Sequence, residues 1–159
     1  MSTLFLIMFL FSIVKSEFLS KNFLENQTED THKDLGRPGK FIKKIVTYGV
    51  TDDFYRISGI KVINEFGTSY MIGKTSSYVK TAGTDSCFLQ IEFKEYNSQI
   101  KYLKVKDYKG VETHLGFPEE QFDNKFGTNK CITVIRAAYD GSRISRLLGY
   151  YDSYPIFRH

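Results

Sequence analysis

Hydrophobic and polar residues alternate in short runs through most of the chain after position 41. In one run Leu89, Ile91 and Phe93 alternate with polar residues, and in another Ile60 and Val62 do the same. A period of two is typical of a strand with one buried and one solvated face, and no long helical pattern competes with it. Glycine, Asp and Asn recur at short spacing between the runs, as tight turns require. The pattern therefore predicts an all-β domain.

The strand pattern also repeats along the chain with a period of 43 to 44 residues. A third unit opens at Ile144 and Leu147, which lie 44 residues beyond Ile100 and Leu103, but it has no room to finish before position 159. Two units of about four strands each and a partial third unit indicate three similar sheets. The matched positions are Ile57 with Ile100, Ile60 with Leu103, Val62 with Val105, Gly67 with Gly110, Ile72 with Leu115, Gly73 with Gly116, Gly83 with Gly127 and Cys87 with Cys131.

The incomplete third unit needs a strand from elsewhere in the chain. Residues 41–50 are the remaining strand-like segment, so the simplest closure uses N-terminal strands to complete the C-terminal sheet. This predicts a β-prism, in which three four-stranded Greek-key sheets surround a pseudo-threefold axis and the N- and C-terminal strands share one sheet. An ordinary β-sandwich would show the same alternation, and the repeat favours the prism.

Composition divides the chain into three segments. Residues 1–16 hold an apolar run followed by Lys15 and Ser16, which is typical of a secretory signal peptide. Residues 17–40 are polar and without a period, so we expect a flexible N-terminal extension with a possible N-glycosylation site at Asn26. The domain itself is expected at residues 41–156. No later apolar run approaches the roughly 20 residues of a membrane span, which predicts a secreted, extracellular protein without a transmembrane anchor.

Three stretches in the last third of the chain suggest a family. They are residues 100–110 (IKYLKVKDYKG), 134–144 (VIRAAYDGSRI) and 147–155 (LLGYYDSYP). With them the sequence resembles the jacalin-like lectin domain over about residues 40–155, and it is closest to the secreted animal branch typified by the zymogen granule lectin. The resemblance implies a β-prism that binds carbohydrate, catalyses no reaction and needs no metal ion or other cofactor.

The resemblance also implies a sugar site in the loop between the last two strands, at one end of the prism. Loop amides and a carboxylate bind neighbouring sugar hydroxyls there. The family carboxylate follows the position of Ile144, where this chain has Ser145, and Asp140 is the other carboxylate of the same loop. Tyr139 and Tyr96 are candidates for stacking on the sugar. The predicted carbohydrate-binding residues are Tyr139, Asp140, Gly141, Ser142, Arg143, Ile144, Ser145 and Tyr96.

The formal net charge of +4 comes with many lysines on the predicted strands. Most of them are expected on solvated strand faces, where they also protect sheet edges. A second interpretation is a basic patch that attracts sulfated glycans or anionic lipid headgroups. The expected members of this anionic-glycan patch are Lys43, Lys44, Lys74 and Lys80.

Cys87 and Cys131 are the two cysteines of the chain. In a secreted protein such a pair normally forms a disulfide. Because both occupy the same position in successive units, they can bond only if that position lies near the pseudo-threefold axis. The alternative is two small buried side chains, and the sequence leaves both interpretations open.

Catalysis, metal binding and nucleic-acid binding find little support. Of the three histidines, His32 lies in the expected extension, His159 ends the chain, and His114 has no nucleophile motif beside it. Neither cysteine has the near Cys or His partner of a zinc site. The aromatic residues fall at core-facing strand positions rather than on a basic stacking platform. The leading prediction is a lectin for neutral or sulfated glycans of cell surfaces, mucus or matrix; the alternative is a structural or protein-interaction module that lacks the sugar site.

Overall fold

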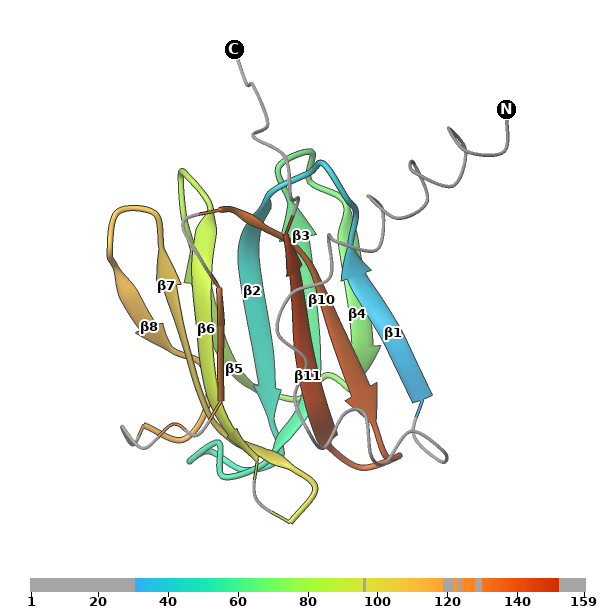
Figure 1. Ribbon diagram of the computed structural model, residues 1–159. Coiled ribbons are helices and arrows are strands. Elements are labelled where there is room, and N and C mark those ends of the chain that lie inside the picture. Colours follow the sequence, from blue (N-terminus) through green and yellow to red (C-terminus); the bar gives the residue numbers. More distant parts are fainter. Residues whose placement is uncertain (1–30, 96, 119–121, 123, 128–129, 152–159) are drawn as a thin grey trace, which may run out of the picture.

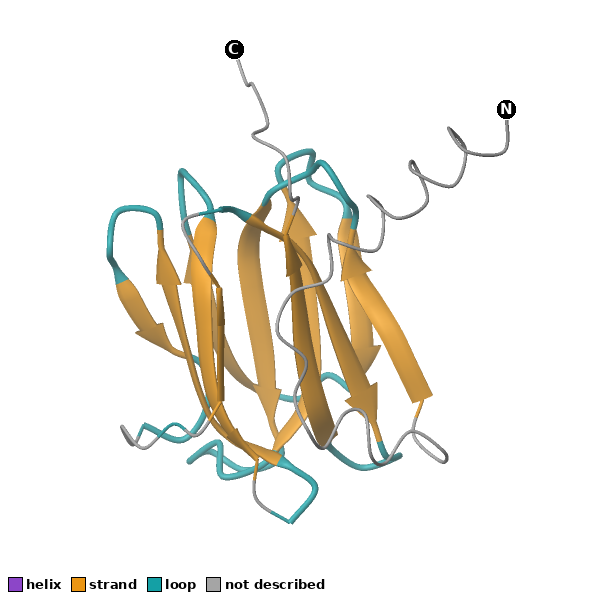
Figure 2. Cartoon of the chain, viewed as in Figure 1, coloured by secondary structure: helices purple, strands orange, loops and turns teal. Residues whose placement is uncertain are grey.

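The computed structural model describes residues 31–95, 97–118, 122, 124–127 and 130–151, and this part of the chain contains eleven strands and no helix (Figures 1 and 2). The predicted signal peptide, residues 17–30 of the predicted extension, Asn26, Tyr96 and residues 152–156 lie outside the described residues. The strands are β1 (Thr31–Gly36), β2 (Ile42–Gly49), β3 (Ile57–Asn64), β4 (Ser69–Gly73), β5 (Tyr78–Gly83), β6 (Phe88–Glu95), β7 (Ile100–Asp107), β8 (Glu112–His114), β9 (Asn124–Gly127), β10 (Ile132–Tyr139) and β11 (Ile144–Tyr151).

Two of the three sheets have the same Greek-key order. Sheet II runs β4-β3-β2-β5 and sheet III runs β8-β7-β6-β9, with antiparallel pairs throughout. In each sheet three consecutive strands form a meander and the fourth returns to lie beside the first. The sequence repeat maps β3 onto β7 and β4 onto β8. The prediction of repeated Greek-key sheets is confirmed.

Sheet I joins the two ends of the described chain. Its order is β1-β10-β11, so β1 takes beside β10 the place that β5 takes beside β2 and β9 takes beside β6 (Figure 1). The prediction that N- and C-terminal strands share one sheet is confirmed. Among the described residues this sheet has three strands, where the sequence predicts four.

The closing strand differs from the one expected. Residues 41–50, expected to complete the C-terminal sheet, instead form β2, which pairs with β3 and β5 in sheet II. Residues 31–36, assigned to the flexible extension, form β1 and pair along their whole length with β10. The strand shows no alternation because, at the edge of sheet I, only Leu35 of its six residues is fully buried. With one buried position, the segment has no alternation of hydrophobic and polar residues from which a strand could be predicted.

The three hairpins that open the sheets share their irregularities. The first strand of each hairpin is eight residues long, and its pairing with the second strand has two register shifts. The extra residue lies on the first strand in the shift near its start and on the second strand in the shift at its end, and each extra residue locally increases the twist. Equal bulges at equal positions are the backbone counterpart of the sequence repeat. The shifts lie between Ile42 and Lys44 and between Tyr48 and Gly49 in β2, between Phe88 and Gln90 and between Lys94 and Glu95 in β6, and between Ile132 and Val134 and between Ala138 and Tyr139 in β10.

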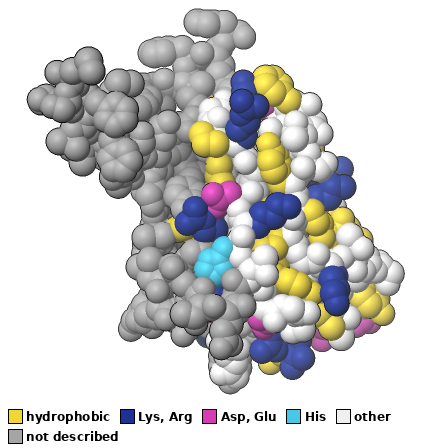
Figure 3. Space-filling model, turned by 90° about the vertical axis from the view of Figure 1, so that its right-hand side faces the viewer, with side chains coloured by type: hydrophobic (Ala, Val, Ile, Leu, Met, Phe, Trp, Pro, Cys, Tyr) yellow, Lys and Arg dark blue, Asp and Glu magenta, His cyan; other side chains and the backbone are white. Residues whose placement is uncertain are grey.

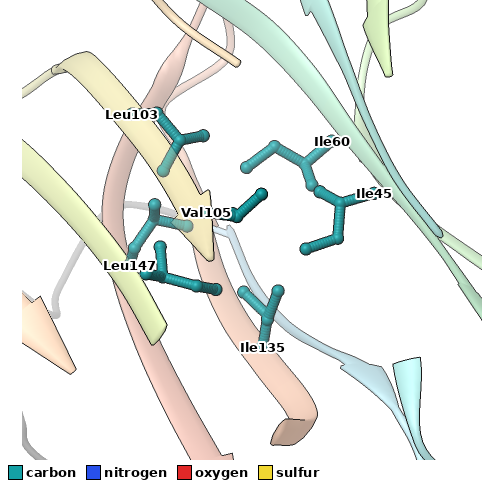
Figure 4. Close-up of a pocket in the computed structure, with 7 residues that line it drawn as sticks. Ile45, Ile60, Leu103, Val105, Ile135 and Leu147 are labelled. Carbon is teal, nitrogen blue, oxygen red and sulfur yellow. The ribbon is translucent and has the colours of Figure 1, made fainter. Parts of the chain in front are cut away.

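The sheets pack their inner faces around a common apolar core. Figure 4 shows its centre, where side chains from all three sheets point toward one another. The void between them measures about 10 Å³, and its lining is entirely hydrophobic, so it leaves no room for a ligand. The lining residues are Ile45, Ile60, Ile91, Leu103, Val105, Ile135 and Leu147.

Cys87 and Cys131 form a disulfide with a Cα–Cα distance of 5.5 Å. Cys87 precedes β6 and Cys131 precedes β10, so the bond links sheet III to sheet I at the end of the prism where these strands begin. Of the two interpretations that the sequence leaves open, the structure has the disulfide.

Candidate functional site

Three hairpin loops lie at the opposite end of the prism from the disulfide, the lower end in Figure 1. They connect β2 to β3 (residues 50–56), β6 to β7 (described at residues 97–99) and β10 to β11 (residues 140–143). We call this the hairpin end, and we call residues 140–143 the Asp140 loop. Four of the predicted carbohydrate-binding residues make up the Asp140 loop.

The Asp140 loop is closed by its own carboxylate. Oδ1 of Asp140 accepts hydrogen bonds from the Ser142 amide at 2.9 Å, the Arg143 amide at 2.9 Å and the Ser142 hydroxyl at 3.0 Å. The Asp140 amide in turn donates to the carbonyl of Arg143 at 3.1 Å. Gly141 has a φ of +100°, which favours glycine, and a Cβ built on it would meet no atom within 4 Å. The tip of the loop is therefore open to solvent, although its amides turn inward to Asp140.

The second carboxylate oxygen of Asp140 faces Arg143, whose Nε lies 3.4 Å from Oδ2. The loop thus presents one carboxylate oxygen and a neighbouring guanidinium at an exposed turn. A fixed acceptor beside a donor fork matches a pair of adjacent sugar hydroxyls, because each hydroxyl both donates and accepts.

The pKa of Asp140 is set by these contacts. Partial burial raises the pKa of this carboxyl. The hydrogen bonds from the amides of Ser142 and Arg143 and from the Ser142 hydroxyl lower it, and so does the charge of Arg143. Together these contacts outweigh burial and hold the pKa below its usual value. A folded-state pKa below the unfolded value means that ionised Asp140 contributes stability above about pH 3.9, and that this contribution is lost as pH falls through the folded pKa.

We therefore expect Asp140→Asn to lower the free energy of unfolding at pH 7 by about 1 kcal/mol, since one acceptor of several hydrogen bonds loses its charge. The difference from the unsubstituted protein should shrink below about pH 4. Urea unfolding at pH 7 and at pH 3 measures it. A difference that stays constant over this range would mean that the carboxylate does not hold the loop.

The other described residues predicted to bind carbohydrate have buried or half-buried side chains. Ile144 is fully buried, and Ser145 is buried with its hydroxyl donating to the carbonyl of Ala138 at 3.3 Å. Tyr139 is half-buried and packs against the core, because its position on β10 faces inward. Its hydroxyl is buried without a hydrogen-bond partner in the described part of the chain. The core therefore holds these three side chains, and a contact of sugar with residues 139, 144 and 145 stays a prediction.

The four lysines of the predicted anionic-glycan patch are not brought together. Lys43 and Lys44 lie at the start of β2, near the disulfide end, and Lys43 donates to the carbonyl of Asp85 at 2.9 Å. Lys74 and Lys80 lie toward the hairpin end, after β4 and within β5. Basic side chains are also scattered singly between hydrophobic ones on the face that Figure 3 shows. The two pairs thus lie toward different ends of sheet II, and anionic-glycan binding by these four residues stays a prediction.

One polar cavity lies on the outer face of sheet I. Its volume is about 190 Å³, and the described residues that line it include His32, Lys33, Asp34 and Arg136. Arg136 binds Asp34 across β1 and β10 through two hydrogen bonds, Nε to Oδ1 at 2.6 Å and Nη2 to Oδ2 at 3.1 Å. Nothing in the sequence predicts this pair, because Asp34 lies in residues 17–40, which show no strand period and were expected to be a flexible extension. Asp34 and Arg136 therefore neutralise each other within this cavity.

Among the described residues no group of three or more His, Cys, Asp or Glu side chains is arranged to hold a metal ion. The same part of the chain contains no helix of the length and hydrophobicity that would cross a bilayer.

No protein-family model and no curated protein sequence matches the chain. Solved structures do match. A prostate-specific WGA16 glycoprotein lectin superposes with a TM-score of 0.65 at 9% identity, over 78% of this chain and 91% of that chain. The Calystegia sepium agglutinin gives a TM-score of 0.55 at 14% identity, over 77% of this chain and 89% of that one. A mannose-binding lectin from Champedak gives 0.54 at 12% identity, over 78% and 97%.

These similarities are similarities of fold, since every identity is far below 25%. Together with the three sheets and their shared bulges, they define a β-prism. The chain has the fold of the jacalin-like lectins.

Proposed function

We propose that the protein is a carbohydrate-binding protein that engages glycans through the Asp140 loop at the hairpin end of the prism. The observation that carries the proposal is the geometry of that loop: an ionised carboxylate fixed by three hydrogen bonds, beside Arg143 and an unhindered Gly141. Lectins among the solved structures of the same fold support binding rather than catalysis. We expect a shallow site that takes one or two sugar rings, because the loop stands on the surface rather than in a cleft.

The test is a glycan array followed by titration calorimetry with the glycan that binds best. Asp140→Ala should weaken that binding by about tenfold or more, since the loss of charge-assisted hydrogen bonds of about 1.5 kcal/mol corresponds to that factor. The matched control is Asp85→Ala, an exposed aspartate at the opposite end of the prism that pairs with Lys109. It should leave the affinity within about twofold. Equal losses in the two variants would refute the Asp140 loop as the site.

A protein-interaction role is the second candidate, and one observation favours it. Val50, Tyr78 and Val79 are 44%, 42% and 50% exposed. Val79 pairs with Tyr48 and Val50 follows two residues later, so these two lie near each other at the hairpin end of sheet II, while Tyr78, next to Val79 on β5, points to the opposite face. Exposed apolar side chains that lie near each other are typical of protein contact surfaces. A glycan array on which the protein binds neither neutral nor sulfated glycans would favour this role.

We further infer that the protein is exported and acts outside the cell. The disulfide between Cys87 and Cys131 supports this, because such bonds persist in oxidising compartments. Residues 1–16 have the composition of a cleavable signal. Mass spectrometry of the protein recovered from the medium of expressing cells tests both points, since it reports the first residue and any glycan at Asn26.

A further inference from the structure

The outer face of sheet II is turned away from the common core and presents three cross-strand rows of residues. Residues that pair across a ladder point to the same face, and core residues such as Ile45 and Ile60 alternate with these positions along the strands. Val79 on this face is 50% exposed. The rows contain no Asp or Glu and consist of Gly83, Lys44, Ile63 and Ser69; Thr81, Val46, Lys61 and Met71; and Val79, Tyr48, Gly59 and Gly73.

Sheet III provides an internal reference for this face, because the sequence repeat places its residues at equivalent positions. The central outward lysine of sheet III is Lys104, and its Nζ lies 3.3 Å from Glu92 and 3.2 Å from Glu112. Nε2 of Gln90 also donates to Oε1 of Glu92 at 2.6 Å. The outer face of sheet III is thus polar, and its central lysine is neutralised within the sheet.

The equivalent lysine of sheet II is Lys61, which lies 43 residues earlier in the chain and lacks both counter-ions. Val46 is its partner on the neighbouring strand, where sheet III has Glu92. Ser69 occupies the position that Glu112 has in sheet III. Within the part of the chain that the structure describes, Lys61 forms no ion pair.

Apolar side chains also replace polar ones around this lysine. By the same repeat, Ile63 stands where sheet III has Lys106, and Met71 stands where sheet III has His114. Met71 lies flat on the sheet, since its Cε would be 2.8 Å from a Cβ built on Gly59. The same backbone can carry a fully polar face, as sheet III shows. In sheet II it carries apolar groups around an unpaired cation, which is typical of a contact surface.

The dimensions of this face fit one helix. Adjacent strands are about 4.8 Å apart and alternate residues about 6.8 Å apart, so the rows span about 14 Å in each direction. A helix with its side chains is about 10 to 12 Å wide, and helices pack an apolar stripe on a sheet. A second copy of the same face fits less well. Stacking would bring Lys44 and Lys61 of both copies into an interface whose rows hold no carboxylate.

We propose that the outer face of sheet II docks an amphipathic helix of a partner protein, with carboxylates on both sides of its apolar stripe. The stripe packs on Val46, Ile63 and Met71. The carboxylates pair with Lys44 and Lys61, in the role that the two glutamates have in sheet III. This inference goes beyond glycan binding and does not rest on it.

The probe is a synthetic helical peptide of about 18 residues, with leucines on one face and glutamates on both flanks. It is titrated into the full-length protein and followed by NMR of the methyl groups. The signals of Val46, Ile63 and Met71 should shift, and the affinity should fall as salt screens the charges. A peptide with lysines in place of the glutamates should bind about tenfold more weakly or less.

The test variant is Ile63→Lys, Met71→His, which gives sheet II the residues that sheet III carries at the same positions. It should therefore fold, and it should weaken binding of the acidic peptide by about tenfold or more. Lys61→Glu should weaken the acidic peptide to a similar extent and strengthen the basic one, and it decides the matter if the double variant does not fold. Lys106→Ala on the outer face of sheet III is the matched control and should change the affinity less than about twofold.

Other occupants of the face give other results. In sedimentation the protein alone should be a monomer. A dimer that the Ile63→Lys, Met71→His variant dissociates would assign the face to a second copy and overturn the proposal. Binding to phosphatidylserine vesicles that the same variant abolishes would assign it to a lipid surface and overturn it too. Absence of binding to the acidic peptide, or equal binding of the two peptides, would also overturn it.

Failure of this docking face and failure of the proposed function are distinguishable. The Asp140 loop lies at the hairpin end, whereas the rows lie on a side of the prism formed by sheet II (Figure 1). Asp140→Ala should therefore lose glycan binding and keep the affinity for the acidic peptide. The Ile63→Lys, Met71→His variant should do the reverse.

Discussion

Replacing Cys87 and Cys131 together by alanine is expected to lower the free energy of unfolding by about 4 kcal/mol. The two residues are 44 apart in the sequence, and the loop-closure entropy of a chain segment of that length sets the magnitude. The bond joins sheet III to sheet I at the end of the prism away from the loops, so the folded structure at the hairpin end should not change.

Urea unfolding of the oxidised protein and of the double variant measures this difference. The control is to repeat both measurements with a reducing agent. The reducing agent should lower the free energy of unfolding of the unsubstituted protein to that of the double variant, and it should not change the free energy of unfolding of the double variant. A loss below about 1 kcal/mol would mean that the unfolded chain gains little freedom when the bond is absent.

The second large effect is expected from Leu35→Ala, which should cost about 3 kcal/mol, in the usual range for truncating a buried leucine. Leu35 is fully buried and is the side chain through which β1 joins the common core. Lys33→Ala, on an exposed position of the same strand, is the matched control and should stay within about 0.5 kcal/mol.

Thermal or urea unfolding measures the loss of unfolding free energy in Leu35→Ala and in Lys33→Ala. Hydrogen exchange then shows which strands are destabilised. In Leu35→Ala the amides of β10 that pair with β1 should exchange faster, because the loss falls on that edge of sheet I. Equal stability of Leu35→Ala and Lys33→Ala would show that β1 does not close the prism.

The sequence predicted the architecture because the architecture is periodic. Matched residues such as Ile60 and Leu103 recur at 43 because β3 and β7 occupy equal places in their sheets, and a repeated unit that cannot bury its apolar face alone must pack on its neighbours. β1 could not be predicted, because it lacks such a pattern. Leu35 is its one fully buried residue, so hydrophobic and polar residues do not alternate along it.

The candidate sites were less predictable because they depend on geometry between distant residues. Asp140 and Ser142 are neighbours in sequence, so their loop could be named from the chain alone. Lys80 was named as a basic residue, but its place beside Phe54 and Gly116 follows only from the packing of sheet II on sheet III. The lack of a counter-ion at Lys61 could not be predicted either, because only the pairing of β2, β3 and β4 shows which side chains lie beside it.

The way β1 is attached has a consequence for self-association. The strand is linked to β2 only through residues 37–41, and it pairs with residues 134–139 of β10. If a protease cleaved this link and β1 were lost, β10 would expose a row of unsatisfied amides and carbonyls. Those groups would accept β1 from a molecule that still carries it, so a concentrated mixture of trimmed and intact protein should form strand-exchanged dimers.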